Sequence, residues 1–125
     1  MISGMGVDLV EIDRIDMIIG RWGDRFVQKV FADEEIRYCR KHVLPAMHFA
    51  ARFAAKEACL KALGIGFGMG VGFKDIWVSR SDKGVPSLMF ADKARILLDK
   101  EAIKGAHLSL THTRRHAVAM VVLEK

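Results

Sequence analysis

Residues 45–63 read PAMHFAARFAAKEACLKAL and predict the longest helix of the chain. Proline fits the first turn of a helix, where its missing N–H is not needed. Gly64 is suited to end the helix in a left-handed conformation. One stripe of this helix carries small residues after its first member: Met47, Ala51, Ala54, Ala58 and Ala62. Small side chains let another element approach closely, so we expect a partner to pack against this stripe.

An adjacent line of the same helix carries Phe49, Phe53, Glu57 and Lys61, each four residues after the last. Glu57 therefore sits beside an apolar face. Its common interpretation is an exposed ion pair with Lys61, which stabilises a helix by only about 0.3 kcal/mol. The alternative is a partly desolvated carboxylate that holds a metal ion.

Upstream of the helix, residues 2–10 predict a strand that is apolar and small except at Asp8. A helix follows from residue 12, and Gly20 and Gly23 are expected to break it. A short helix is predicted around residues 33–41. Asp8 is either a cap of the first helix or a functional carboxylate, because burying an uncompensated charge is costly.

Downstream, glycine recurs in GIGFGMGVG, residues 64–72. Two short strands, 75–80 and 87–90, flank a turn, and a helix is predicted over 91–102. Residues 106–113 and 116–123 predict a closing hairpin. The expected fold class is α+β: a compact single domain over residues 1–125, with an antiparallel β-sheet packed on the long central helix.

The composition favours an anionic partner, since 20 Lys and Arg stand against 15 Asp and Glu, a formal charge of +5. A small basic nucleic-acid-binding module is the main competing interpretation. It would need exposed aromatic residues between basic ones, and most aromatic residues lie where a core would need them. We expect no membrane span, no signal peptide and a cytoplasmic location. Cys39 and Cys59 are expected to be structural, and Cys59 lies in an apolar helical stretch where a buried thiol acts as a small hydrophobe.

Asp8 and Glu57 would meet the needs of magnesium in phosphate chemistry, which takes one or two carboxylates, waters and substrate phosphates. This requires the first strand to pack beside the long helix. The glycine run lacks the Gly-Lys-Ser/Thr of a Walker loop, and its simpler interpretation is a loop. The histidines lack zinc spacing, and no Gly-x-Ser-x-Gly indicates a serine hydrolase.

Three motifs in register resemble the small bacterial holo-acyl-carrier-protein synthases of the phosphopantetheinyl transferase superfamily. GMGVDLVEIDRI at 4–15 resembles the family's Gly-hydrophobic-Gly-hydrophobic-Asp opening. RFAAKEACLKALGIGFG at 52–68 resembles its Phe-x-x-Lys-Glu-Ala-x-x-Lys-Ala signature. AHLSLTHTRRHAVAMVVLE at 106–124 resembles its His-x-Ser-x-(Ser/Thr)-His strand and hairpin.

The resemblance implies transfer of 4′-phosphopantetheine from coenzyme A to a serine of apo-acyl carrier protein, in fatty acid biosynthesis. Asp8 and Glu57 would hold Mg²⁺, and Lys61 would contact the coenzyme A pyrophosphate as a third catalytic residue. A larger set would bind the cofactor: Arg52, Lys61, Gly64, Gly66, Gly84, Pro86, His107, Ser109, Thr111 and His112. Carrier docking would use Arg14, Arg21, Arg25 and Phe26. The resemblance also implies a homotrimer with active sites between subunits.

Two positions depart from the family pattern. Val85 stands where a lysine or arginine is common in the Gly-x-Pro turn, which leaves that turn without its basic side chain. Ala32 stands where a threonine commonly precedes the short helix, and Asp33 is expected to act as the cap instead. The base that accepts the serine proton stays open between a metal-linked water, Glu57 and a histidine. A trimeric scaffold that has lost its metal is a further alternative, against which the Asp8, Glu57 and Lys61 set argues.

Overall fold

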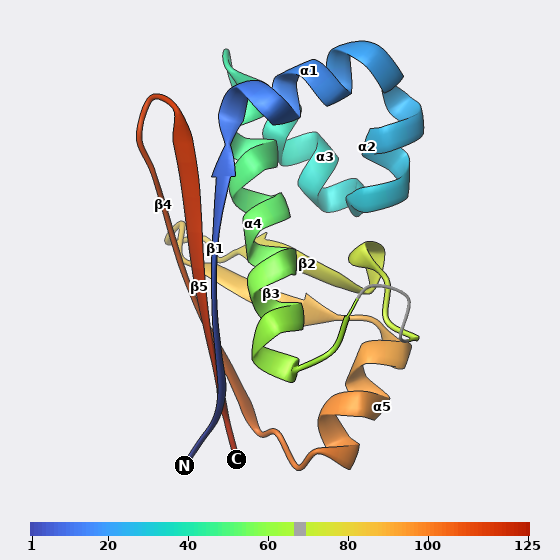
Figure 1. The fold of residues 1–125 in the computed structure, drawn as a ribbon, viewed down its shortest axis with the longest axis vertical. Helices are drawn as coiled ribbons and strands as arrows, with labels where there is room; N and C mark the ends of the chain where they lie inside the picture. Colours follow the sequence, from blue (N-terminus) through green and yellow to red (C-terminus); the bar gives the residue numbers. More distant parts are fainter. Residues whose placement is uncertain (67–69) are drawn as a thin grey trace.

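The computed structural model describes residues 1–66 and 70–125, and Figure 1 shows a long helix lying against a narrow sheet. Gly68 of the glycine run lies outside the described residues. The elements in chain order are β1 (Ile2–Glu11), α1 (Ile12–Trp22), α2 (Asp24–Val30), α3 (Asp33–Arg40), α4 (Pro45–Leu63), η1 (Phe73–Asp75), β2 (Ile76–Arg80), β3 (Pro86–Phe90), α5 (Asp92–Lys100), β4 (Gly105–His112) and β5 (His116–Glu124). This order confirms the α+β class predicted from the sequence.

Helix α4 packs directly against β1, as its stripe of small residues predicted. A Cβ atom on Gly6 would lie 1.9 Å from the Ala58 carbonyl oxygen, and one on Gly4 would lie 2.0 Å from that of Ala62. Any side chain at either position would therefore push β1 away from α4. The glycines of the amino-terminal motif are needed for this close approach, and the approach carries Asp8 to the helix.

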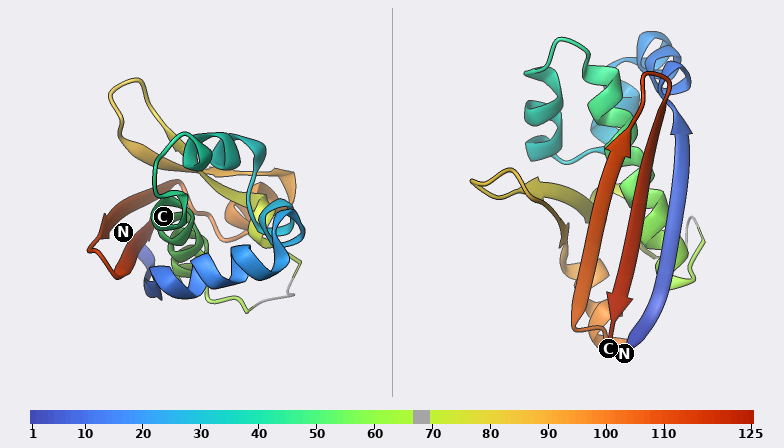
Figure 2. Two further views of the ribbon diagram at one scale, coloured as in Figure 1. Left: turned by 90° about the horizontal axis from the view of Figure 1, so that it is seen from above. Right: turned by 90° about the vertical axis from the view of Figure 1, so that its left-hand side faces the viewer.

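The main sheet has the strand order β1–β5–β4 and is antiparallel throughout. Val7 on β1 and Ser109 on β4 both pair with Met120 of the central strand. Side chains alternate along a strand, so one face of the sheet packs on α4. The side chains of Val7, Ser109 and Met120 point to the opposite face. Figure 2 shows that none of the described elements covers that opposite face, which we call the outer sheet face.

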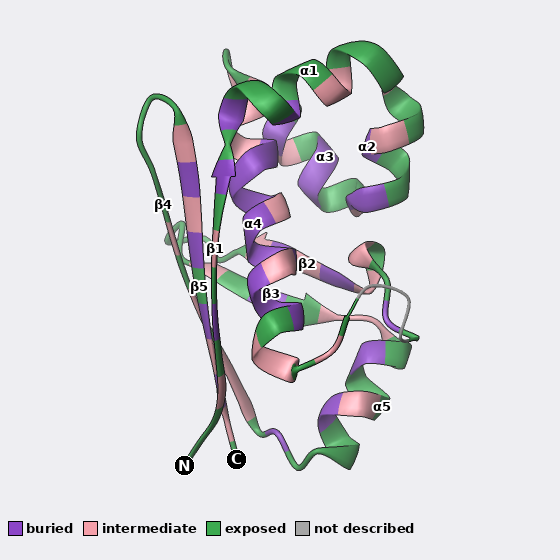
Figure 3. Cartoon of the chain, viewed as in Figure 1, coloured by how far each residue is buried: buried purple, intermediate pink, exposed green. Residues whose placement is uncertain are grey.

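Strands β2 and β3 form a second, two-stranded antiparallel sheet beside α4. Figure 3 shows buried residues along much of α4 and at alternate positions of β5, with others in the shorter helices. Cys39 and Cys59 are free thiols in this core, and the burial of Cys59 was predicted. Burial raises the pKa of each to about 12, which keeps them protonated and unreactive at neutral pH. The described helices include no stretch long and apolar enough to cross a bilayer.

Two local predictions about helix ends were wrong, and one helix was missed. Helix α1 continues through Gly20, so the break predicted there was wrong; the break predicted at Gly23, whose φ is +55°, is confirmed. A separate helix, α2, follows and was not predicted. Helix α3 begins after Ala32 with no capping side chain at that position; Glu35 instead accepts the Ala32 N–H at 3.0 Å, so Asp33 is not the cap.

Candidate active site

The carboxyl end of β1, helix α1 and the second half of α4 enclose a cleft of about 370 Å³. Asp8 and Glu57 both line it, together with Lys61. The Lys61 ammonium lies 3.0 Å from Asp8 Oδ1 and also donates to the Val7 carbonyl at 3.1 Å. The described contact of Lys61 is thus with Asp8 and not with its helical neighbour Glu57. Asp8 does not cap α1, which begins after Glu11.

Glu57 is half-buried in this cleft. Desolvation raises its pKa, the negative charge of Asp8 raises it further, and Lys61 opposes the shift. Two carboxylates that face one cleft repel each other until a cation lies between them. This arrangement is therefore chemically suited to a divalent cation.

The donors in the cleft fit magnesium better than zinc. Both carboxylates offer hard oxygen ligands, and Mg²⁺ retains waters and substrate phosphates in its remaining positions. No group of three or more His, Cys, Asp or Glu side chains in the described residues has the arrangement of a metal cage. A two-carboxylate site of this kind needs an anionic substrate to complete it.

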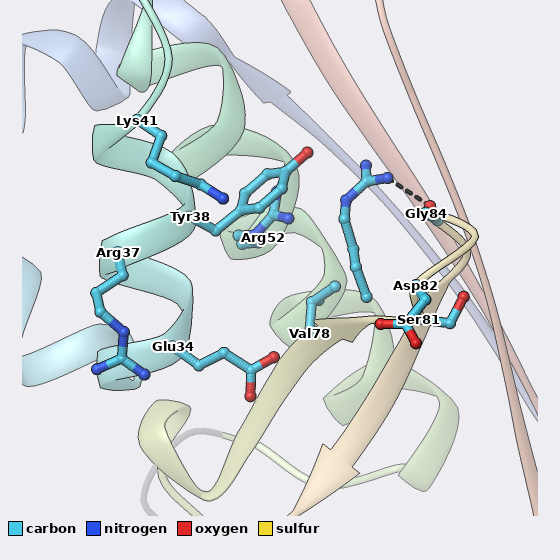
Figure 4. A pocket seen from close by; sticks show the side chains of 10 residues that line it. Glu34, Arg37, Tyr38, Lys41, Arg52, Val78, Ser81, Asp82 and Gly84 are labelled. Carbon is cyan, nitrogen blue, oxygen red and sulfur yellow. Dashed lines mark hydrogen bonds between the residues drawn. The ribbon is translucent and has the colours of Figure 1, made fainter.

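A second, larger cavity of about 610 Å³ lies between α3, α4 and β2. Figure 4 shows Tyr38, Lys41 and Arg52 on its helical side, facing Ser81, Asp82 and Gly84 on the turn opposite. The Arg52 guanidinium carbon lies 4.1 Å from the centre of the Tyr38 ring. Four basic side chains and two carboxylates line the cavity: Arg37, Lys41, Arg52 and Arg80, with Glu34 and Asp82.

Arg80 supplies the positive charge that the Gly-x-Pro turn lacks at Val85. Its Nη1 donates to the Gly84 carbonyl at 2.5 Å, marked by the dashed line in Figure 4. Its guanidinium also lies 5.0 Å from the Tyr38 ring. Sequence reasoning missed Arg80 because the family pattern placed the basic residue inside the turn, whereas here it extends from the end of β2.

Arg52 and Lys61 lie on opposite sides of α4. They are nine residues apart, about two and a half turns of helix. Arg52 is buried and donates to the His48 carbonyl at 3.3 Å, while its Nε has no partner among the described groups. An unpartnered buried guanidinium nitrogen next to a basic cavity indicates a site for an anion. One subunit thus presents two separate sites.

The β4 residues predicted to bind nucleotide point away from the Asp8 cleft. His107, Ser109 and Thr111 are exposed on the outer sheet face, whereas Asp8 lies on the side of β1 that meets α4. His107 forms an ion pair with Glu124 of the neighbouring strand. Thr111 and His112, at the far end of β4, line a hollow of about 270 Å³ that Arg52 and Arg80 also line.

The chain's sequence matches the profile of the 4′-phosphopantetheinyl transferase superfamily over residues 4–121. The chain belongs to this superfamily. It is 49% identical to the holo-[acyl-carrier-protein] synthase of Syntrophus aciditrophicus over 124 residues, which is 99% of this chain and 97% of that protein. It is 45% identical to that of Koribacter versatilis, covering 99% of both chains.

Solved structures of superfamily members share the fold. The holo-[acyl-carrier-protein] synthase of Neisseria meningitidis superposes with a TM-score of 0.93 at 31% identity, over the whole of both chains. That of Helicobacter pylori, in complex with coenzyme A, gives 0.85 at 32% identity, covering 96% of this chain and 99% of that one.

In this superfamily member, the residues predicted for carrier docking lie on α1 and α2. Arg14 lines the Asp8 cleft. Arg25 and Phe26 line a separate apolar hollow with Trp22, whose ring also lies 5.3 Å from the Arg21 guanidinium. The Phe26 ring contacts the ring of Phe53, which lines the Asp8 cleft (centroids 6.4 Å apart). The hollow and the cleft are therefore neighbours.

The structure brings Asp8, Glu57 and Lys61 together in one cleft. Arg52 and Gly84 line the basic cavity, and Thr111 and His112 line the 270 Å³ hollow beside it, which Arg52 also lines. Pro86 follows the turn as the first residue of β3, and Gly64 ends α4 with a φ of +72°. Gly66 lies just beyond it. Tyr38 and His48 were missed, because neither belongs to a motif and only packing brings them beside Arg52.

His48 stacks on His42, with 3.8 Å between ring centroids. It also lines the 270 Å³ hollow that Thr111 and His112 line. Desolvation lowers the pKa of His48 to about 4, and the positive potential of His42, Arg52, His112 and Arg80 contributes. The folded protein therefore holds this imidazole neutral at a pH where the unfolded chain protonates it.

We expect this histidine to make stability depend on pH. The unfolded chain binds the extra proton below its pKa of 6.5, so the stabilisation is complete above 6.5 and is lost as pH falls toward 4. The difference in unfolding free energy between wild type and His48→Gln, measured with urea, should change over this interval. Gln28→Ala, which changes an exposed side chain that does not titrate, is the control and should follow the wild-type curve. Parallel curves for His48→Gln and wild type would contradict the expectation.

Proposed function

We propose that this protein transfers 4′-phosphopantetheine from coenzyme A to a serine of an apo-acyl carrier protein, releasing adenosine 3′,5′-bisphosphate. The observation that carries the proposal is the convergence of Asp8, Glu57 and Lys61 in one cleft, from segments about 50 residues apart. The names of the relatives agree with this reaction class, since each is a holo-[acyl-carrier-protein] synthase.

In this proposal the Asp8 cleft receives the pyrophosphate of coenzyme A. Asp8 and Glu57 would hold Mg²⁺, which would polarise the phosphoryl oxygens and neutralise the charge on the leaving group. Lys61, which is paired with Asp8, has an exposed side chain and would turn toward the pyrophosphate to add positive charge there. The carrier serine would attack the β-phosphorus of coenzyme A in line. The P–O bond between that phosphorus and the leaving bisphosphate would break.

The basic cavity around Tyr38 would bind the adenosine 3′-phosphate end. Arg52 and Arg80 both approach the Tyr38 ring, and the Arg52 Nε lacks a partner in the described structure. Guanidinium groups match phosphate oxygens in both geometry and charge. Gly84, with a φ of +78°, and Pro86 shape the turn that closes the cavity.

We further propose that each active site spans two subunits of a homotrimer. The cavity that would take the nucleotide and the cleft that would take the pyrophosphate lie on opposite sides of α4. The outer sheet face offers a surface for association, because Met5, Val7 and Leu9 are 56–63% exposed along one strand. Large exposed apolar patches commonly mark such interfaces.

The carrier would dock on α1 and α2, where Arg14, Arg21 and Arg25 are exposed. Positive charge there would attract an acidic carrier and speed encounter, an effect that salt weakens. Phe26 would provide an apolar anchor beside the hollow. Because Phe26 touches Phe53 at the edge of the Asp8 cleft, a docked carrier would place its serine near the reacting phosphate.

Intact-mass spectrometry of an apo-acyl carrier protein tests the proposed reaction. Incubation with this protein, coenzyme A and Mg²⁺ should add one phosphopantetheine to the carrier, and EDTA should prevent it. A carrier whose acceptor serine is replaced by alanine is the control and should stay unmodified. An unmodified wild-type carrier, together with no binding of coenzyme A, would refute the proposal.

Mixing two inactive variants tests the shared site. Glu57→Gln damages the cleft, and Arg80→Glu reverses a charge in the cavity without disturbing the core. Co-expressed subunits should regain about a quarter of wild-type transfer, since a random pairing of neighbours gives one intact site in four. The control is a mixture of the two separately purified variants under conditions in which their subunits do not exchange. No recovery in mixed trimers would place both halves of the site in one subunit.

A further inference from the structure

One buried ion pair joins elements that line the basic cavity. The Lys56 ammonium lies 2.7 Å from Glu35 Oε1, and both side chains are fully buried. Lys56 precedes Glu57 on α4, and Glu35 lies in the first turn of α3. Neither residue lines the Asp8 cleft or contacts a group assigned to the proposed reaction.

All three ammonium hydrogens of Lys56 and both carboxylate oxygens of Glu35 take part in hydrogen bonds. Lys56 Nζ also donates to the carbonyl oxygens of Phe73, at 3.0 Å, and Ile76. Glu35 Oε1 accepts the Ala32 N–H, and Oε2 accepts the Val78 N–H at 2.9 Å. An ammonium group has three hydrogens to donate, and all three have acceptors here. The network is fully satisfied.

Stability alone does not explain such a pair. Two charges lose their hydration on burial, and well-packed apolar side chains of similar size often stabilise a protein equally or better. What apolar side chains cannot do is hold backbone N–H and carbonyl groups. Glu35 and Lys56 hold such groups of η1 and β2, and so fix these elements relative to α3 and α4.

The elements joined in this way form the walls of the basic cavity. Val78 lines the cavity and donates its N–H to Glu35 on the buried side. Glu34, next to Glu35, lines it from α3. Arg52 lines it from α4, one turn before Lys56. A shift of any wall would change the distance between the guanidinium groups that would contact the nucleotide.

We propose that the Glu35–Lys56 pair is a positioning device for the nucleotide cavity. It fixes α3, α4 and β2 at the separation that a 3′-phosphorylated adenosine requires. The inference rests on the proposed function, because that function supplies the nucleotide. Both residues act through the backbone and through Arg52 and do not touch the substrate themselves.

Glu35→Gln tests the inference, because glutamine has only one oxygen. Its amide NH₂ would face either the Lys56 ammonium or the Val78 N–H, and two donors would then oppose each other. We expect binding of adenosine 3′,5′-bisphosphate, measured by calorimetry, to weaken by about tenfold through misplacement of the cavity walls. The KM for coenzyme A should rise likewise, while the KM for the carrier stays near the wild-type value.

Asp24→Asn is the matched control. It removes a carboxylate from an ion pair with Arg40 that is equally short, 2.6 Å, but exposed. Exposed pairs contribute little, so nucleotide binding should equal that of wild type. Equal binding by Glu35→Gln and wild type would overturn the inference. If wild type itself binds no nucleotide, the proposed function fails instead, and the two failures are distinct.

A double variant, Glu35→Leu with Lys56→Met, separates positioning from folding. It replaces the charges with apolar side chains and leaves no unpaired charge, so it should still fold, with a melting temperature below that of wild type because buried backbone groups lose their partners. Its nucleotide binding should remain about tenfold weaker, since the backbone groups of β2 lose their partners. Wild-type binding by this variant, or its failure to fold, would overturn the inference.

Discussion

Replacing Glu57 with glutamine is expected to lower the rate of phosphopantetheine transfer by about a thousandfold, because it removes half of the anionic site that would hold the magnesium ion. Asp8→Asn should have a comparable effect. Side-chain size and the hydrogen-bonding oxygen are preserved in both substitutions, so the loss is one of charge. Transfer is measured by the appearance of the modified carrier over time, at saturating coenzyme A and Mg²⁺.

The stability of Glu57→Gln should not fall with its activity. The folded-state pKa of Glu57 is raised, so its ionised form destabilises the fold, and the stability present at low pH is lost as pH rises through the titration. Glutamine removes that unfavourable charge, and the melting temperature at pH 7 should be equal to or above that of wild type. A control, Glu101→Gln, changes an exposed carboxylate just after α5 and should alter neither property. Wild-type transfer by Glu57→Gln would eliminate the metal assignment.

Replacing Gly6 with valine is expected to separate β1 from α4 and to inactivate the protein. Even the first carbon of a side chain would lie 1.9 Å from the Ala58 carbonyl oxygen, a backbone atom that cannot turn aside. We expect the unfolding free energy to fall by at least about 3 kcal/mol, as in severe overpacking. Urea denaturation followed by circular dichroism measures it. Transfer by the fraction that stays folded should also fall, since Asp8 moves away from Glu57.

Gly20→Ala is the matched control for a glycine substitution. Gly20 lies inside α1 with no described atom within 4 Å of its added Cβ. Alanine favours a helix over glycine by about 1 kcal/mol, so this variant should be more stable than wild type. If Gly6→Val instead matched the stability of wild type, the close contact between β1 and α4 would not exist in solution.

The sequence alone predicted the parts of the fold that depend on local periodicity. Pro45 and Gly64 marked the ends of α4, and the alanine stripe indicated a close partner. Glycines at positions 4 and 6 supplied that partner, and the strand they lie in carries Asp8. Residue spacing fixes which side chains share a face of a helix or strand, so these features follow from the order of the residues.

Helix α2 and the true end of α1 were harder to predict. Gly20 suggested a break, yet a single glycine costs a helix only about 1 kcal/mol, and packing of Ile12 and Ile15 in the core outweighs it. The turn occurs at Gly23, where the backbone has the positive φ that glycine adopts readily. Because Gly20 and Gly23 are only three residues apart, the local sequence does not indicate which of them ends the helix.

The pairing of the charged groups was decided only by the tertiary structure. Helical spacing offered Lys61 to Glu57, but β1 brings Asp8 within 3.0 Å of it. Arg80 reaches the Gly84 turn although no motif contains it. Local sequence determines which face of its own element a side chain occupies. The distance between charges on different elements depends on how those elements pack. The spacing of residues along the chain does not determine that distance.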